Sequence, residues 1–149
     1  MEHNFSVILI RMNETHFALN QQYEWEKNSP VEFAYNLTLK YKQIDKDINV
    51  IVSVSSDHAD QPFRFSVTYE GLFAFNVVPS TEVLDRIAQI NCASIIFPYI
   101  RECVSDLTRR ASLPPLNLPP VNFVARYEQE YKPEAKKPSS KETRRKSRE

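Results

Sequence analysis

The sequence predicts an α+β domain in which a four-stranded antiparallel sheet is covered on one face by a long helix and a short C-terminal helix. Four segments in the first half of the chain alternate apolar and polar residues with a period of two, which is typical of strands. The second half repeats apolar residues at helical spacing. Strands that precede helices and are joined by short connections favour helices packed on one face of an antiparallel sheet.

The second, third and fourth expected strands each gather their apolar side chains on one face. Strands are predicted at Phe5–Met12, Val31–Tyr41, Ile48–Ser55 and Phe63–Tyr69. Because the opposite face is polar, only the apolar face has to be covered by another element. Gly71 lies in the extension of the fourth strand, where a glycine is typical of a bulge or a bend.

A long helix is expected to follow a cap at Ser80 or Thr81 and to include the apolar residues from Val83 to Leu107. Its apolar stripe is broad, which indicates burial on more than one side. Pro98 lies inside this pattern. Because its ring clashes with the carbonyl of Ser94, we expect the helix to be kinked or broken there.

A proline-rich segment follows the long helix. Leu113–Pro120 fits neither a helix nor a central strand, yet it carries three leucines. After it, Asn122 is suited to cap a short last helix. The apolar stripe of that helix consists of Phe123, Tyr127 and Tyr131.

The charge distribution divides the chain into a domain, residues 1–131, and a basic tail, residues 132–149. The tail holds eight basic and three acidic residues, so it carries +5 and the domain carries −5. It has no large apolar residue, and we expect it to be disordered. A basic tail is able to bind nucleic acid by counterion release. However, no aromatic residue is interleaved with these charges, which favours a solvated tail instead.

The composition argues against an enzyme that binds nucleotides. The chain has a single glycine among 149 residues, whereas phosphate-binding loops need several. Three histidines and two cysteines show no spacing that is typical of metal ligands. We therefore expect no catalytic activity, no cofactor and no metal.

Cys92 and Cys103 are eleven residues apart in the expected helix. On a straight helix this spacing separates them by roughly 16 Å, which is too far for a disulfide. We expect two free thiols that pack as small apolar groups. The chain also lacks an apolar run of roughly 20 residues, and its first four residues do not resemble a signal peptide. We therefore expect a cytoplasmic protein.

Two segments outside the regular elements are unusually apolar. Residues 17–31 include Phe17, Leu19, Tyr23 and Trp25, and the proline-rich segment includes Leu113, Leu116 and Leu118. One interpretation is that both segments fill gaps in a small core. The other is that they border a groove for an extended apolar peptide, in which prolines reduce the ordering cost of binding.

Two motifs in the second half resemble the SecB protein-export chaperone family. The helix contains Phe97-Pro98-Tyr99-Ile100-Arg101-Glu102-Cys103, and the following loop contains Pro115-Leu116-Asn117-Leu118-Pro119-Pro120-Val121-Asn122-Phe123. Both motifs occur in the order and at the spacing of that family. The resemblance is specific over about residues 92–123.

The resemblance implies an ATP-independent chaperone that holds unfolded polypeptides competent for export. It implies a homotetramer, a dimer of dimers, that pairs through the first strand and the long helix. The interface residues would be Ile95, Ile96, Tyr99, Ile100 and Cys103. Clients would bind between the crossover loop, residues 17–31, and the loop that joins the helices, residues 113–121. The client contacts would be Phe17, Leu19, Tyr23, Trp25, Leu113, Leu116, Leu118 and Val121.

The chain departs from the pattern of family members that deliver clients to the SecA motor. Those members present acidic residues on the outer sheet face, and Glu14 suits one such position. Arg64 and Ser66, on the polar face of the fourth strand, are not acidic, and the tail is basic. Three hypotheses therefore stand: an export chaperone, a chaperone dedicated to one client such as an antitoxin, and a nucleic-acid-associated adaptor that acts through the tail.

Overall fold

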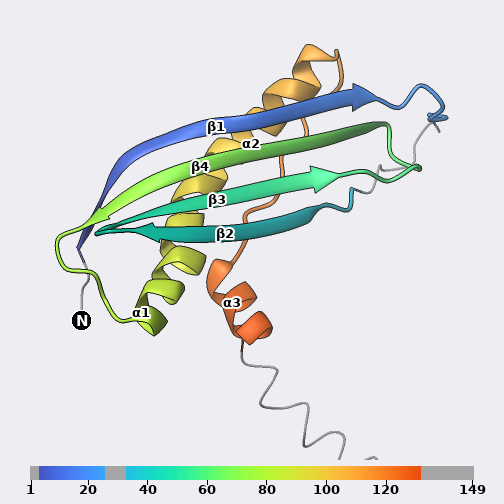
Figure 1. The fold of residues 1–149 in the computed structure, drawn as a ribbon. Helices are drawn as coiled ribbons and strands as arrows, with labels where there is room; N and C mark the ends of the chain where they lie inside the picture. The colour runs from blue at the N-terminus through green and yellow to red at the C-terminus, as the bar shows by residue number, and fades with distance from the viewer. Residues whose placement is uncertain (1–3, 26–32, 132–149) are drawn as a thin grey trace, which may run out of the picture.

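The chain forms a four-stranded antiparallel sheet with its helices on one face (Figure 1). The structure, a computed structural model, describes residues 4–25 and 33–131. The elements in chain order are β1 (Phe5–Leu19), β2 (Asn36–Ile44), β3 (Asp47–Ser56), β4 (Phe63–Phe75), α1 (Thr81–Arg86), the π-helical segment η1 (Ile87–Cys92), α2 (Ala93–Arg110) and α3 (Phe123–Tyr131). The predicted α+β class is confirmed. The basic tail lies outside the described residues.

The strands are arranged in the order β1-β4-β3-β2, so β1 and β2 form the two edges of the sheet. Three strands are longer than predicted: β1 continues to Leu19, β4 continues to Phe75, and β3 gains one residue at each end. The register of β1 against β4 shifts between Val7 and Leu9 and again between Met12 and Glu14. At each shift one extra residue in β1 interrupts the alternation of side chains between the two faces. A search for strict alternation therefore ends the predicted strand before its actual end.

Gly71 does not mark a bulge in β4, as the sequence suggested. It pairs with Val50 in an unbroken ladder between β3 and β4. A Cβ atom at this position would lie 2.7 Å from Cε2 of Phe73 and 3.0 Å from Cδ1 of Ile96. The glycine is therefore needed because the Phe73 ring and Ile96 of α2 fill the space beside it.

The expected break at Pro98 is also absent, since α2 continues through this residue to Arg110. Arg86 and Cys92, at the two ends of the π-helical segment, both have right-handed helical dihedral angles. Residues 81–110 are therefore one continuous helical run. The only irregular part of this run is the π-helical segment, which ends at Cys92. Pro98 has no N–H to donate to the carbonyl of Ser94, but the helix continues past it.

The core lies between the sheet and α2, which crosses behind the strands in Figure 1. It combines apolar residues of β3 and β4 with residues of the helical run, and Ile96 and Ile100 are both fully buried. The predicted cap of α3 is confirmed, because the backbone N–H of Ala125 donates to Asn122 Oδ1 at 3.0 Å. None of the helices within residues 4–25 and 33–131 combines the length and apolar character needed to cross a membrane.

Candidate functional site

Three aromatic rings meet at the end of the sheet where β1 ends and β4 begins. Phe63 is buried, and its ring centroid lies 5.3 Å from that of Phe17 and 4.9 Å from that of Phe33. Phe17 and Phe33 are half-buried; Phe17 lies near the end of β1, and Phe33 lies shortly before β2. The stack therefore holds the chain against the core near both ends of the β1–β2 connection.

Beyond this stack the apolar side chains become exposed. Trp25 is 58% exposed and Leu19 is 43% exposed. Tyr23 is half-buried and packs edge-on against Trp25, with ring centroids 5.0 Å apart. Phe17 and Leu19 were predicted to lie in a loop, but both belong to the end of β1. They pair with Phe65 and Phe63 of β4.

The loop that joins α2 and α3 is fastened to α2 by hydrogen bonds. Arg101 Nε donates to the carbonyl of Leu118 at 2.7 Å. The backbone N–H of Leu116 donates to Thr108 Oγ1 at 2.9 Å, and that of Leu113 donates to the carbonyl of Thr108 at 3.0 Å. These bonds fix a segment that has no regular secondary structure.

The predicted client residues of this loop differ in burial. Leu113, Leu116 and Val121 are half-buried and pack against the core. Leu118 is only 1% exposed, so it fills the core and is not available to a client in this structure. Sequence spacing does not separate the four residues, because the loop has no helical or strand period to indicate which side chains point inward.

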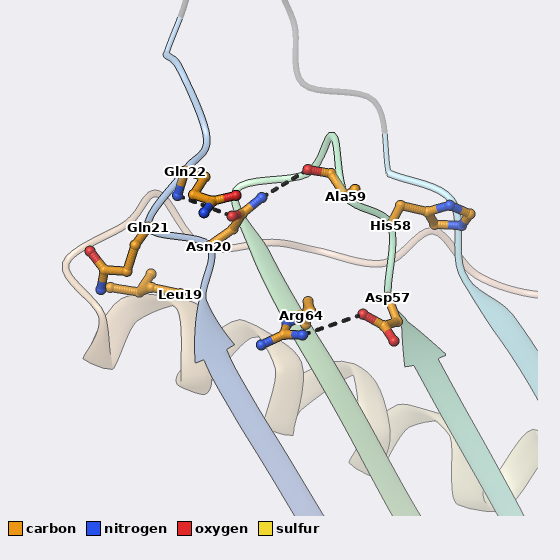
Figure 2. A pocket seen from close by; sticks show the side chains of 8 residues that line it. All are labelled: Leu19, Asn20, Gln21, Gln22, Asp57, His58, Ala59 and Arg64. Atoms are coloured by element: carbon orange, nitrogen blue, oxygen red, sulfur yellow. Dashed lines mark hydrogen bonds and ion pairs between the residues drawn. The ribbon is translucent and has the colours of Figure 1, made fainter.

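Two depressions open beside the exposed end of β1. The first, of about 460 Å³, is formed by residues that directly follow β1 and by the connection between β3 and β4 (Figure 2). The second, of about 520 Å³, shares Asp57 and Arg64 with the first and includes Phe17. Arg64 Nη1 lies 3.9 Å from Asp57 Oδ1, and both side chains are largely exposed. The walls are mixed polar and apolar, unlike a closed pocket for a small molecule.

The residues predicted to form an oligomer interface divide into two groups. Ile96 and Ile100 lie in the core of this chain, so they are corrected to core positions. Tyr99 is 48% exposed, and Ile95 and Cys103 are half-buried. The breadth of the helical stripe indicated two buried sides, but it did not indicate which side faces the sheet.

The first strand adds exposed apolar residues that the sequence analysis did not single out. Val7 is 47% exposed, and Ile8 and Met12 are each 51% exposed on the edge strand β1. Their alternation was visible in the sequence. Their exposure was not, because it depends on β1 being an edge strand with two register shifts.

Both cysteines are free, as predicted. Burial raises the pKa of the Cys92 thiol to about 12, and burial is also the main cause of the raised pKa of Cys103. Both are therefore neutral thiols near pH 7, without the features of a reactive cysteine. Within the part of the chain that the structure describes, no group of three His, Cys, Asp or Glu residues is placed to hold a metal ion.

The fold is shared with two solved structures. A solved structure of the Mycobacterium tuberculosis Rv1957 SecB-like chaperone, in complex with a ChAD peptide from the Rv1956 HigA1 antitoxin, superposes with a TM-score of 0.68 at 22% identity. The similarity covers 78% of this chain and 90% of that one. A Streptococcus agalactiae protein of unknown function superposes with a TM-score of 0.52 at 14% identity, over 80% of this chain and 99% of that one.

The sequence comparisons identify the family. Residues 12–134 match the family described as "Preprotein translocase subunit SecB". The chain is 40% identical over 102 residues to the protein-export protein SecB of Methylobacillus flagellatus, which covers 68% of this chain and 64% of that protein. It is 31% identical over 124 residues to the SecB of Dinoroseobacter shibae, which covers 80% and 72%. The chain therefore belongs to the SecB family.

Proposed function

We propose that this protein is an ATP-independent cytoplasmic chaperone, and not an enzyme, that binds non-native polypeptides and keeps them competent for export. Membership of the SecB family supports the chaperone activity, and the relatives named protein-export proteins support the export role. The client surface would lie between the β1–β2 connection and the loop of residues 113–121.

One observation carries the proposal: the end of β1 and the described residues that follow it expose large apolar side chains beside an aromatic stack that is anchored in the core. Trp25 and Leu19 are available to a partner, while Phe17 is held in place by Phe63. Each anchor of this size contributes about 1.5–3 kcal/mol when a partner covers it. Three or four such anchors are enough for micromolar binding, about −8 kcal/mol, after ordering costs.

The test is suppression of aggregation of a slowly refolding protein in the absence of nucleotide. We expect a stoichiometric amount of the full chain to keep the refolding protein in solution, because the activity needs only binding. Added ATP should not change the result. Aggregation at the same rate with and without the chain would contradict the proposal.

We further propose that the chain assembles as a homotetramer, a dimer of dimers. The exposed apolar residues of edge strand β1 and of α2 form the surface that would pair, with Met12 and Tyr99 as its largest exposed members. An edge strand with uncovered apolar residues is a liability in a monomer, and pairing with a second copy removes it.

The outer sheet face favours one alternative, a chaperone dedicated to a single client. The motor-binding members present acidic residues on the outer sheet face, whereas Arg64 and Ser66, on the polar face of β4, are not acidic, and Arg64 is largely exposed. The similar Mycobacterium tuberculosis chaperone was solved with a peptide from an antitoxin. Titration of the chain with purified SecA separates the two: binding supports export delivery, and its absence favours the dedicated chaperone.

A further inference from the structure

Asn20, the first residue after β1, uses every polar atom that it has. Its backbone N–H donates to the carbonyl of Pro62 at 2.8 Å, and its own carbonyl accepts from the N–H of Tyr23 at 3.2 Å. Its side-chain Nδ2 donates to the carbonyls of Ala59 at 2.9 Å and Gln61 at 2.8 Å. Its Oδ1 accepts from the N–H of Gln22 at 3.2 Å.

These bonds join two segments that are far apart in the sequence. Figure 2 shows the Asn20 side chain between the turn that leads toward Trp25 and the β3–β4 connection that carries Ala59. On one side Asn20 closes the turn of residues 20–23. On the other side it donates hydrogen bonds to three backbone carbonyls of the connection between β3 and β4, within residues 59–62. The turn is therefore anchored to the β3–β4 connection through one residue, by its side chain and by its backbone N–H.

The far end of the β1–β2 connection is held by the same element. The carbonyl of Ala34 accepts from Ser56 Oγ at 2.8 Å and from Gln61 Nε2 at 3.4 Å. Ser56 and Gln61 are both buried. The β3–β4 connection thus fastens both described ends of the segment that carries the exposed aromatic residues of the proposed client site.

Only an amide side chain of this length supplies two N–H donors and one acceptor at this position. An aspartate has nearly the same shape, but its carboxylate would face the two carbonyls of Ala59 and Gln61 with no hydrogen to donate. An alanine would leave the same carbonyls without these donors. The position therefore requires the donors and the acceptor of an amide group, and a side chain of similar volume does not replace them.

We propose that Asn20 is a positioning residue for client binding. It fixes the backbone conformation of the turn that leads to Tyr23 and Trp25, and it anchors that turn to the β3–β4 connection. The effect on clients rests on the proposed chaperone function. The effect on Trp25 does not, because it is measured without any client.

The experiment uses Asn20→Asp and Asn20→Ala in the full chain. Asn76→Asp and Asn76→Ala are the matched controls, because Asn76 is exposed directly after β4, at the other end of the sheet. Trp25 is the single tryptophan of the chain, so its emission and its quenching by acrylamide report this segment alone. Melting curves establish the temperature at which every variant is fully folded. Client affinity is then measured there, with fluorescein-labelled, reduced and carboxymethylated lactalbumin as the permanently unfolded probe.

We expect both Asn20 variants, while folded, to change the quenching of Trp25 and to weaken binding of the probe about tenfold, whereas the two Asn76 variants change neither. A lower melting point with unchanged quenching and unchanged affinity would overturn the inference, because it would show that Asn20 serves stability alone. Changed quenching with unchanged affinity would overturn the link to clients. A wild-type chain that fails to bind the probe would instead contradict the proposed function, and unchanged quenching in the Asn20 variants would still overturn the positioning role on its own.

Discussion

Gly71 of β4 lies directly against Ile96 of α2, so close that a Cβ atom at position 71 would come within 3.0 Å of Ile96 Cδ1. The same atom would lie 2.7 Å from the ring of Phe73. Ile96 and Phe73 are both fully buried, so neither has free space into which to move. The single glycine of the chain is thus a packing position between sheet and helix.

Gly71→Ala is therefore expected to destabilise the protein although alanine is better suited than glycine to a strand interior. Overpacking of this kind costs about 1–3 kcal/mol. Urea unfolding measures the difference, with Ser66→Ala on the outward face of β4 as the control, for which about 0.5 kcal/mol or less is expected. Equal stability of Gly71→Ala and the wild type would show that the helix–sheet contact is looser than the structure indicates.

Glu70 should make stability dependent on acid pH. It is buried on the outer sheet face, where it is paired with Arg11 and accepts from Asn49 Nδ2 at 3.2 Å. The hydrogen bond from Arg11 is the main reason why its pKa lies below the ordinary value of 4.5. A carboxyl with a lowered folded pKa contributes stability above pH 4.5, and this contribution disappears as the pH falls through the folded pKa.

Urea unfolding of the wild type and of Glu70→Gln between pH 7 and pH 3 checks this expectation. The wild type should be the more stable of the two near neutral pH, and the difference should shrink below about pH 4.5. Glu24→Gln, at an exposed position, controls for the loss of one negative charge. A difference that stays constant down to pH 3 would mean that the ion pair with Arg11 does not stabilise the fold.

Assembly should depend on exposed apolar residues of β1 and α2, and folding on the buried residues of α2. Met12→Asp and Tyr99→Asp place a charge on the exposed apolar surface, and we expect them to dissociate the assembly while the subunit stays folded. Ile100→Asp places an unpaired charge in the core, which typically costs several kcal/mol, and should unfold the subunit. Sedimentation together with circular dichroism distinguishes the two results. A wild-type chain that sediments as a monomer at micromolar concentration would refute the tetramer.

Deletion of residues 132–149 should leave folding and client holding nearly intact. The tail is charged and lacks large apolar residues, so it has little to contribute to a core. If the tail binds nucleic acid, that binding should disappear with the deletion and weaken steeply with salt. Duplex binding that survives the deletion would place the nucleic-acid contact on the domain instead.

The sequence predicted the sheet, the helices and their order because alternation and helical periodicity reflect which faces are buried. It did not predict the full length of β1, since the register shifts near Ile8 and Asn13 interrupt the alternation. It also did not separate Ile95 from Ile96 by role. Adjacent residues on a broad apolar helix differ by about 100° in direction, and only the position of the sheet decides which one is buried.

The candidate site was predictable in part for a related reason. Trp25 and Leu19 stood out as apolar residues outside the predicted strands and helices, and both are exposed. Leu118 stood out for the same reason but lies in the core, and its carbonyl accepts a hydrogen bond from Arg101 of α2, 17 residues earlier in the sequence. Such a long-range contact leaves no local pattern. The role of Asn20 was not predicted, because the carbonyls that accept from its side-chain Nδ2 belong to residues about 40 positions away.

The most direct test of the account compares Trp25→Ala with Leu118→Ala, and measures the free energy of unfolding and the Kd for an unfolded polypeptide on both variants. Trp25→Ala should bind about tenfold or more weakly with nearly unchanged stability, because its side chain is largely exposed. Leu118→Ala should lose about 2–5 kcal/mol of stability, because its side chain fills the core. Wild-type affinity in folded Trp25→Ala would contradict the claim that the exposed β1–β2 connection binds clients.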